Sequence, residues 1–352
     1  MKAQILFETT VFSNPLAIHS YFAWPSVARL KDGTLVAGCS GMRTRHIDPF
    51  GKGLLKFSRD EGRTWSAPVV AIDTLMDDRD VGLASFGESG LIVTSFNHRF
   101  DRIPSKPPTE YDLSYIRLAR EDARQDLISG SVFTMSFDNG FSFGPVRRIP
   151  VSSPHGPLEL KDHALLYVGR VFPQGDVPDD EMIRAYRVEQ DGTYREVGRI
   201  RTPEKELLYC EPHAVLLSDG RIVVQIRVES RSKPRTRFTL FQCESNDLGR
   251  TFSEPVRILG DMAGAPPHLL ELSDGRVLSA FASRYGRNGI YAMTSTDGAR
   301  TFSEPERIVP LGPDWDLGYP ASAELDDGSI LTVYYAHETE CGPAVVKAVI
   351  WR

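Results

Sequence analysis

The chain repeats one pattern of apolar and polar positions along its whole length. Six times, two short apolar runs stand on either side of a small polar pair. The pairs are Asp32-Gly33, Ser89-Gly90, Asp162-His163, Asp219-Gly220, Asp274-Gly275 and Asp327-Gly328. Such pairs accept the left-handed backbone of a tight turn, so an Asp-Gly between two apolar runs indicates a β-hairpin. The sequence therefore predicts six hairpins.

The hairpins recur at a nearly constant spacing. The second residue of each pair stands at 33, 90, 163, 220, 275 and 328, so the intervals are 57, 73, 57, 55 and 53 residues. The long interval contains a polar, proline-rich stretch at 97–112, which we expect to be an inserted loop. A period in the low fifties with about four short strands per unit is typical of a β-propeller. We predict an all-β, six-bladed β-propeller that forms one domain over residues 1–352, with no helical pattern of useful length.

A second repeat, S-x-D-x-G-x-T-W, lies C-terminal to the hairpin in several units. The copies are 58–65 (SRDEGRTW), 136–143 (SFDNGFSF), 245–252 (SNDLGRTF) and 295–302 (STDGARTF), the last with its Gly one place earlier. Ser and Asp side chains of such a box bond nearby amides, and Gly takes a positive φ. We expect the box to build a turn and not to take part in catalysis.

The two ends of the chain supply strands to the same unit. The third unit keeps only a relic of the box at 189–194, and the sixth has none because the chain ends in an apolar strand at 345–351. The strand-like residues 4–7 would complete this last blade and close the ring. Closure removes the exposed edges of the sheets.

Composition and charge narrow the classes of function. The chain has 352 residues, 41% of them hydrophobic and 25% charged, with a net charge of −6. This mild acidity argues against nucleic acid or an anionic membrane as a partner. We find no signal-peptide layout and expect a cytoplasmic protein, or a secreted one if the sequence is trimmed. The four cysteines (Cys39, Cys210, Cys243, Cys341) show neither metal spacing nor a disulfide framework, and no cofactor is expected.

Candidate chemistry lies where the innermost strand of each blade begins, because these positions converge on one mouth of a propeller's channel. The starts read Ala23-Trp24-Pro25, Arg79-Asp80, His155-Gly156-Pro157, Glu211-Pro212-His213, Pro266-Pro267-His268 and Gly318-Tyr319-Pro320. The set is richer in ionisable groups than packing requires.

The boxes and the hairpin frame resemble the sialidase (neuraminidase) superfamily of six-bladed propellers, over nearly the whole chain. That resemblance implies an exo-acting glycoside hydrolase that cleaves a terminal anionic sugar, sialic acid or a relative. Glu211 and Arg227, either side of the hairpin at 219–220, match a family glutamate and a carboxylate-binding arginine. Tyr319 in G-Y-P-A-S resembles the nucleophilic tyrosine of the family's G-Y-S motif.

The resemblance implies further site residues. Asp48, ten residues before the first box, resembles the family's acid/base aspartate. Arg287 resembles another arginine of the family's carboxylate-binding triad, with Arg284 as the runner-up. We expect Trp24 either to pack at the floor of the channel or to serve as a platform for a sugar ring. His213 and His268 are further substrate-binding candidates and have no metal-ligand spacing.

One departure changes what the resemblance implies. The first arginine of the family belongs to an F-R-I-P motif, but this chain reads Phe22-Ala23-Trp24-Pro25. The glutamate that steadies that arginine is also missing, because its place reads VYY at 333–335. Arg43, Arg45 or Arg79 are candidates to supply a replacement guanidinium, and Arg79 is included among the expected substrate-binding residues.

Two other functions remain open on the same frame. The first is another carbohydrate-active enzyme, a lyase or hydrolase of uronate-containing glycans with a base among His46, His155, His213 and His268. The second is a glycan-binding propeller without catalysis. The missing arginine favours these two, whereas Glu211, Tyr319 and Asp48 favour the sialidase-like hydrolase.

Overall fold

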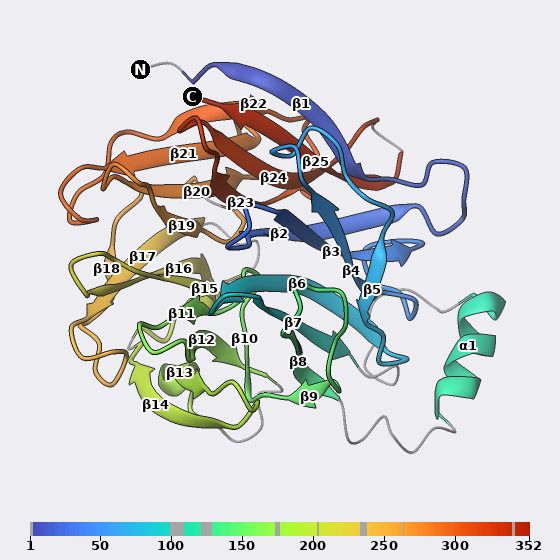
Figure 1. The fold of residues 1–352 in the computed structure, drawn as a ribbon, viewed down its shortest axis with the longest axis horizontal. Coiled ribbons are helices and arrows are strands. Elements are labelled where there is room, and N and C mark those ends of the chain that lie inside the picture. The colour runs from blue at the N-terminus through green and yellow to red at the C-terminus, as the bar shows by residue number, and fades with distance from the viewer. Residues whose placement is uncertain are drawn as a thin grey trace.

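The structure is a computed structural model in which six antiparallel sheets stand around a common centre (Figure 1). It describes residues 3–98, 109–120, 129–172, 177–202, 204–232, 238–262, 264–339 and 342–352. Cys341 lies outside these residues, and the three described cysteines are free thiols. The sequence-based prediction of a six-bladed β-propeller is confirmed.

The blades follow the chain in order. Blade 1 is β2 (Tyr21–Arg29), β3 (Leu35–Arg43), β4 (Lys52–Ser58) and β5 (Val69–Ile72). Blade 2 is β6 (Asp77–Phe86), β7 (Gly90–His98), β8 (Gly130–Ser136) and β9 (Arg147–Arg148). Blade 3 is β10 (Val151–Ser152), β11 (Leu158–Glu159), β12 (Leu165–Val171), β13 (Ile183–Val188) and β14 (Tyr194–Ile200), with a 3₁₀ turn at Asp179–Glu181.

The remaining blades complete the ring. Blade 4 is β15 (Leu207–Leu216), β16 (Ile222–Ser230), β17 (Phe238–Ser245) and β18 (Val256–Arg257). Blade 5 is β19 (His268–Glu271), β20 (Val277–Ser283), β21 (Gly289–Ser295) and β22 (Glu306–Pro310). Blade 6 is β23 (Gly318–Glu324), β24 (Ile330–His337), β25 (Ala344–Trp351) and β1 (Ile5–Phe12).

The ring closes in blade 6, as the sequence predicts. The N-terminal strand β1 pairs antiparallel with the C-terminal strand β25, and the two termini lie close together at one edge (Figure 1). The first and last parts of the chain therefore belong to one sheet.

The middle strands are buried because each sheet is covered on both faces by its neighbours. All nine residues of β16 are buried, although Gln225, Arg227, Glu229 and Ser230 are polar. Four of its apolar residues lie in a core shared by blades 3 and 4, and Val223 packs in a cluster shared by blades 4 and 5. A strand covered on both faces need not alternate apolar and polar positions, so polar residues in β16 require partners inside the protein.

The predicted turns form with one shift in position. Gly33, Gly220, Gly275, Gly328 and His163 all have a positive φ between the first two strands of their blades. In blade 2 the left-handed glycine is Gly87 and not the expected Gly90, which already belongs to β7. A Cβ at Gly90 would lie 2.4 Å from the carbonyl oxygen of Phe86, so close packing explains this glycine.

The boxes are turns that join the third and fourth strands of four blades. In the first copy, Ser58 Oγ accepts a hydrogen bond from Gly62 N at 2.8 Å, and Asp60 accepts one from Thr64 N at 2.8 Å. In the last copy Ala299 takes the left-handed position, and its amide bonds Ser295 Oγ at 2.9 Å. The boxes thus build turns, as expected from their composition.

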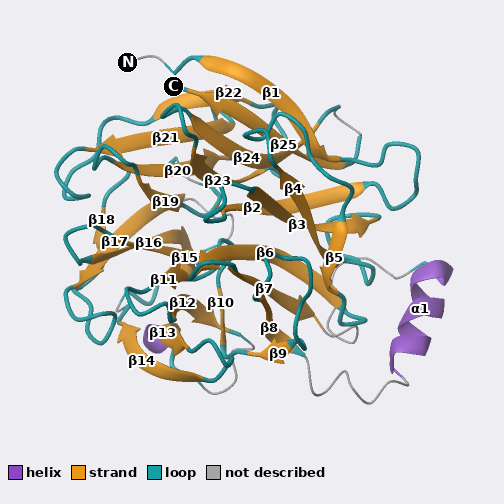
Figure 2. Ribbon diagram, in the orientation of Figure 1, coloured by secondary structure: helices purple, strands orange, loops and turns teal. Residues whose placement is uncertain are grey.

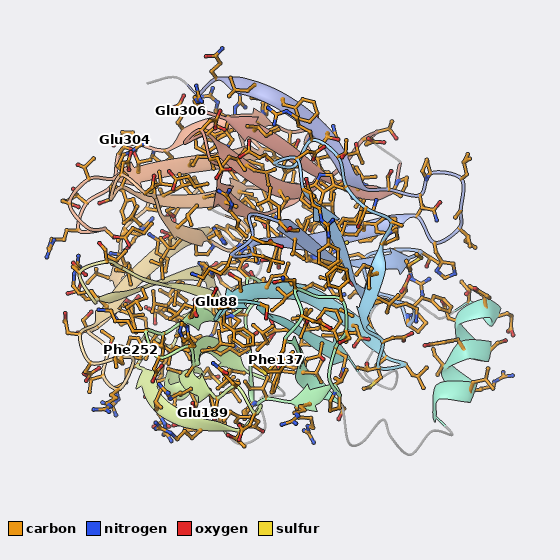
Figure 3. The ribbon with its side chains drawn as sticks, viewed as in Figure 1. Glu88, Phe137, Glu189, Phe252, Glu304 and Glu306 are labelled. Carbon is orange, nitrogen blue, oxygen red and sulfur yellow. The ribbon has the colours of Figure 1, made fainter. Side chains whose placement is uncertain are left out.

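The boxes and the hairpins lie at the same end of the ring. Each inner strand starts at one end, which we call the mouth, and runs to its hairpin at the opposite end. Because the strands alternate in direction, the connection between the third and fourth strands also lies opposite the mouth. Phe252 and Glu189, which belong to such connections, lie toward the rim of the ring in Figure 3.

The long interval of blade 2 contains a helix that the sequence analysis missed. Residues Glu110–Arg120 form α1, the separate helix at the side of the ring in Figure 2, so the expectation of no useful helical pattern is wrong. The loop expected at 97–112 overlaps the helix only at 110–112. Thr109 and Asp112 cap it reciprocally: Asp112 accepts from Thr109 N at 2.8 Å, and Thr109 Oγ1 accepts from Asp112 N at 3.1 Å. This T-x-x-D capping box is the overlooked signal. Residues 99–108 lie outside the described part of the chain.

Helix α1 is held against blade 1 by charge and by aromatic contacts. Asp112 forms an ion pair with Arg45 at 2.7 Å, and the ring of Tyr111 stacks on Phe50 with 4.9 Å between centroids. Within the described residues, no helix has both the length and the apolar character that crossing a membrane requires.

Candidate active site

Among the described residues, five of the six blades have a left-handed residue at or near the start of the inner strand. Trp24, Asp80, Gly156, Glu211 and Tyr319 all have a positive φ, at 54°, 38°, 85°, 50° and 53°. Four of these are not glycine, and non-glycine residues adopt this conformation only where the surrounding structure imposes it. The pairing register of β2, β6, β15 and β23 shifts at these positions. Such irregularities re-aim a side chain, so four blades point a side chain at the centre by the same device.

A tyrosine and a glutamate meet at the centre from blades 6 and 4. The Tyr319 hydroxyl donates a hydrogen bond to Glu211 Oε1 at 2.5 Å. Tyr319 is 5% exposed, and its pKa is raised well above the usual value by burial and by the negative charges of Glu211 and Asp80. The phenol therefore keeps its proton at neutral pH until a base removes it, and Glu211 is the base in contact.

Arg227 on β16 orients Glu211 through the other carboxylate oxygen. Its Nη1 donates to Glu211 Oε2 at 2.5 Å, and its Nη2 bonds Glu229, which is 1% exposed. Burial opposes the positive charge of Arg227, but Glu211 and Glu229 outweigh it and raise the pKa of the guanidinium. The sequence-predicted residues Glu211, Arg227 and Tyr319 thus form one connected network.

Asp80 on β6 is coupled electrostatically to Glu211 and Tyr319 and was not among the predicted site residues. It is 5% exposed, and burial together with the charge of Glu211 raises its pKa to about 7, against the effect of Arg79. A carboxyl group with this pKa is partly protonated at neutral pH, and can both give and take a proton. The signal for it in the sequence was its place at the start of an inner strand.

Arg79 is the best placed of the three candidate replacement arginines. Its guanidinium carbon lies 4.0 Å from the centroid of the Trp24 ring, and its Nη1 donates to the His46 carbonyl at 2.9 Å. Arg43 is fully buried in an ion pair with Asp77 at 2.5 Å, and Arg45 is paired with Asp112 in helix α1. Trp24 is 1% exposed, so it supports Arg79 and offers no platform to a sugar.

Arg284, and not Arg287, is the arginine of blade 5 at the site. The guanidinium carbon of Arg284 lies 5.5 Å from the Tyr319 ring centroid, and its Nη2 donates to the Tyr335 hydroxyl at 3.2 Å. Arg287 is exposed at the turn between β20 and β21. The contact with Tyr319 therefore favours Arg284, the runner-up, over the exposed Arg287, which lies three residues further along the same connection.

Asp316 gathers four side chains beside the site. It accepts hydrogen bonds from the Tyr21 and Tyr335 hydroxyls at 2.7 and 2.9 Å and is bonded by His46 Nδ1 at 2.8 Å and His337 Nε2 at 3.3 Å. Burial alone would raise the pKa of Asp316, but its hydrogen bonds with the histidines and Tyr21 hold the pKa well below the usual value. Tyr335, at the expected place of the missing glutamate, thus connects Arg284 to Asp316.

His213 and His268 lie between the blades, under the site. Their rings stack 4.4 Å apart, and each Nδ1 accepts a backbone N–H, from Leu269 at 2.8 Å and from Ser322 at 3.3 Å. Burial lowers the pKa of both rings, so they are neutral. This geometry gives no support to the substrate-binding role expected for them. In the described part of the chain, no group of three or more His, Cys, Asp and Glu residues has the arrangement of a metal site.

Asp48 is used inside its own loop. Its side chain is fully buried, and its oxygens accept hydrogen bonds from Thr44 N, Thr44 Oγ1, Arg45 N and Phe50 N. A carboxylate enclosed by four donors cannot reach a leaving-group oxygen in this conformation. The structure therefore does not support the acid/base role expected for Asp48. The position of Asp48 ten residues before the first box did not reveal that its side chain is buried.

No family model and no curated protein matches this sequence. Solved structures do match its fold. A protein of unknown function from Dyadobacter fermentans is similar with a TM-score of 0.77 at 20% identity, over 99% of both chains. The NanB sialidase of Streptococcus pneumoniae, as its K499G mutant, gives 0.70 at 14% identity, over 98% of this chain and 70% of that one. The α-L-arabinanase of Penicillium chrysogenum, solved with arabinobiose, gives 0.64 at 15% identity, over 98% of both chains. This chain thus has the propeller fold that sialidases and arabinanases share.

Proposed function

We propose that this protein is an exo-acting glycoside hydrolase that removes a terminal anionic sugar, sialic acid or a relative, with Tyr319 as the nucleophile and Glu211 as its base. The observation that carries the proposal is the 2.5 Å hydrogen bond from the Tyr319 hydroxyl to the Glu211 carboxylate. Both side chains are turned to the centre by left-handed backbone positions, which a purely structural tyrosine would not require.

A tyrosine nucleophile suits a sugar that carries a carboxylate at its anomeric carbon. A carboxylate nucleophile would be repelled by that charge, whereas a neutral phenol is not, and sialidases are exceptions to the two-carboxylate rule of glycosidases for this reason. The proton of Tyr319 passes to Glu211 as the phenolic oxygen bonds the anomeric carbon. The glycosidic carbon–oxygen bond breaks in the same step.

We assign the general acid to Asp80 in place of Asp48. A protonated Asp80, with a pKa of about 7, gives its proton to the departing oxygen. Asp80 then takes a proton from the water that attacks the anomeric carbon. The bond from that carbon to Tyr319 breaks, and Glu211 returns the proton to the phenolate, so the protein is restored.

Arg79 and Arg284 support an anionic substrate. Arg79 lies on Trp24 beside Ala23, where the family arginine is missing, and it contacts Asp77 only at 3.4 Å. Arg284 donates to the Leu317 carbonyl and to the Tyr335 hydroxyl. Both acceptors are neutral, so these two hydrogen bonds do not cancel its positive charge. Arg227, by contrast, is neutralised by two carboxylates and serves to orient Glu211.

A neutral terminal sugar is the second candidate. Arg227 is paired with Glu211 and Glu229, and position 23 holds alanine in place of the family's arginine. The site therefore has less positive charge for an anionic sugar than a complete arginine triad would supply. An arabinanase shares the fold. The lyase hypothesis loses support for three of its four candidate bases, because His155, His213 and His268 are buried. The fourth, His46, is partly exposed, and its Nδ1 is bonded to Asp316 at 2.8 Å.

The test is a covalent label. Fluorinated sialyl and arabinofuranosyl fluorides should trap the glycosyl-enzyme, and peptide mass spectrometry should place the added sugar on Tyr319. Labelling by the sialyl reagent alone supports the first candidate, and labelling by the arabinosyl reagent alone supports the second. Turnover of the matching aryl glycosides with the label on any residue other than Tyr319 would refute the assigned nucleophile.

A further inference from the structure

Trp315 presents an open aromatic ring beside the site. It is 57% exposed, lies in the connection between β22 and β23, and precedes Tyr319 by four residues. Large aromatic side chains are normally used to bury apolar area. More than half of the Trp315 surface is left open, while its ring lies 5.1 Å from that of His46.

The backbone that carries this ring is fastened on both sides. Asn288 Nδ2 donates to the carbonyl oxygens of Gly312 at 3.0 Å and Asp314 at 2.8 Å, before the tryptophan. After it, the Asp316 carboxylate holds its four partners, and Arg284 Nε donates to Leu317 O at 2.8 Å. The segment is thus rigid while its central side chain is left open, and rigid elements make precise contacts with ligands.

The contacts of this segment place it at the edge of the site. The ring of His46 lies 5.1 Å from Trp315 and 4.9 Å from Trp24, on which Arg79 is stacked. The neighbouring Asp316 bonds Tyr335, whose ring lies 5.9 Å from that of Tyr319. Trp315 is therefore linked to the reacting centre on one side through His46 and on the other through Asp316.

We infer that Trp315 is the stacking platform for the second sugar of the substrate, the neutral ring joined to the one that Tyr319 attacks. This inference rests on the proposed hydrolase function. Sugar rings have an apolar C–H face that packs on an aromatic ring, while their hydroxyls remain in water. The flanking Asp314, whose side chain is 35% exposed, disfavours an anionic sugar at this position.

The test compares two leaving groups on one sugar. The probes are 3′-sialyllactose with sialyl fluoride, and arabinobiose with arabinofuranosyl fluoride, since fluoride is too small to reach a platform. Trp315→Ala should lower kcat/KM for the saccharide, 3′-sialyllactose or arabinobiose, at least about tenfold more than for the fluoride, through KM. Trp315→Phe should restore part of the loss, and Phe141→Ala, an exposed aromatic of a box opposite the mouth, is the matched control.

A binding measurement separates this inference from the proposed reaction. Tryptophan fluorescence of the Glu211→Gln protein should change on titration with the saccharide, and Trp315→Ala in that background should abolish the change. Binding without any hydrolysis by the unmodified enzyme would refute the proposed reaction and leave the platform intact. Equal losses for saccharide and fluoride, or no saturable binding of either saccharide, would overturn the platform.

Discussion

The phenolic oxygen of Tyr319 lies 2.5 Å from Oε1 of Glu211, although 108 residues separate them in the chain. Tyr319 enters from blade 6 and Glu211 from blade 4, each at a left-handed backbone position. Arg227 fixes the other oxygen of the same carboxylate. This relation makes Glu211 the base for Tyr319, and the catalytic predictions below follow from it.

Tyr319→Phe should leave the fold intact and remove most of the activity. The substitution deletes the attacking oxygen and keeps the ring, so we expect kcat to fall by about a hundredfold to ten-thousandfold. Circular dichroism and thermal unfolding should match those of the unmodified protein. Glu211→Gln should lower kcat similarly because the base is lost, and full activity in either variant would exclude this pair from the reaction.

The rate should depend on a protonated Asp80. Burial and Glu211 raise the pKa of Asp80 to about 7. Since the acid must carry its proton, kcat should fall as the pH rises through about 7. Asp80→Asn should abolish this alkaline limb and slow substrates with poor leaving groups more than those with good ones. A pH–rate profile that keeps the same alkaline limb in Asp80→Asn would reject the assignment.

Asp80 should also make the protein less stable at alkaline pH. Its pKa in the folded state lies above the value of about 3.9 in the unfolded chain, so the folded protein binds more protons. The contribution to the free energy of unfolding therefore declines as the pH rises from about 4 through about 7. Urea titrations should show that Asp80→Asn gains stability relative to the unmodified protein at pH 8 and loses this advantage below pH 4. Asp78, whose pKa is also raised to about 7, is present in both proteins and cancels in the comparison.

Two arginines of one hairpin provide a matched pair. Arg284 lies over the Tyr319 ring, whereas Arg287 is exposed at the turn. Arg284→Ala should reduce kcat/KM for an anionic substrate by about tenfold or more, since a charge-assisted contact is worth about 1.5–3 kcal/mol. Arg287→Ala should change kcat/KM less than about twofold at moderate ionic strength. The reverse order of effects would restore Arg287 to the site.

Asp48 should matter for stability and not for proton transfer. Asp48→Ala removes the acceptor of the buried Phe50 amide and of the partly buried Thr44 and Arg45 amides. We expect the free energy of unfolding to fall by about 3 kcal/mol, measured by urea titration. The activity of the fraction that remains folded should keep the alkaline limb of the pH profile. Loss of that limb in Asp48→Ala would instead identify Asp48 as the acid.

The sequence also contained one local signal that was passed over. Helix α1 begins at a reciprocal cap between Thr109 and Asp112, which can be read directly from T-x-x-D. The polar, proline-rich residues before the helix predict a loop at 97–112, and this loop overlaps the helix only at 110–112. The left-handed glycine of blade 2 was misplaced by three residues, because Gly87 and Gly90 both flank the turn.

The local pattern of the sequence determined the architecture. Asp-Gly turns, apolar runs and the S-x-D-x-G-x-T-W boxes are short-range features, and their spacing was sufficient to predict six blades and the closure of the ring by β1 and β25. The sequence also predicted three residues of the site, Glu211, Arg227 and Tyr319, which the structure brings into contact. The tertiary structure alone decided the rest. Asp80 became an acid candidate, Asp48 was enclosed and Arg284 displaced Arg287, because burial and the direction of a side chain depend on neighbouring blades. The pattern of residues in one strand does not show which of its side chains the adjacent sheet buries. The charge state of a carboxyl group depends on that burial.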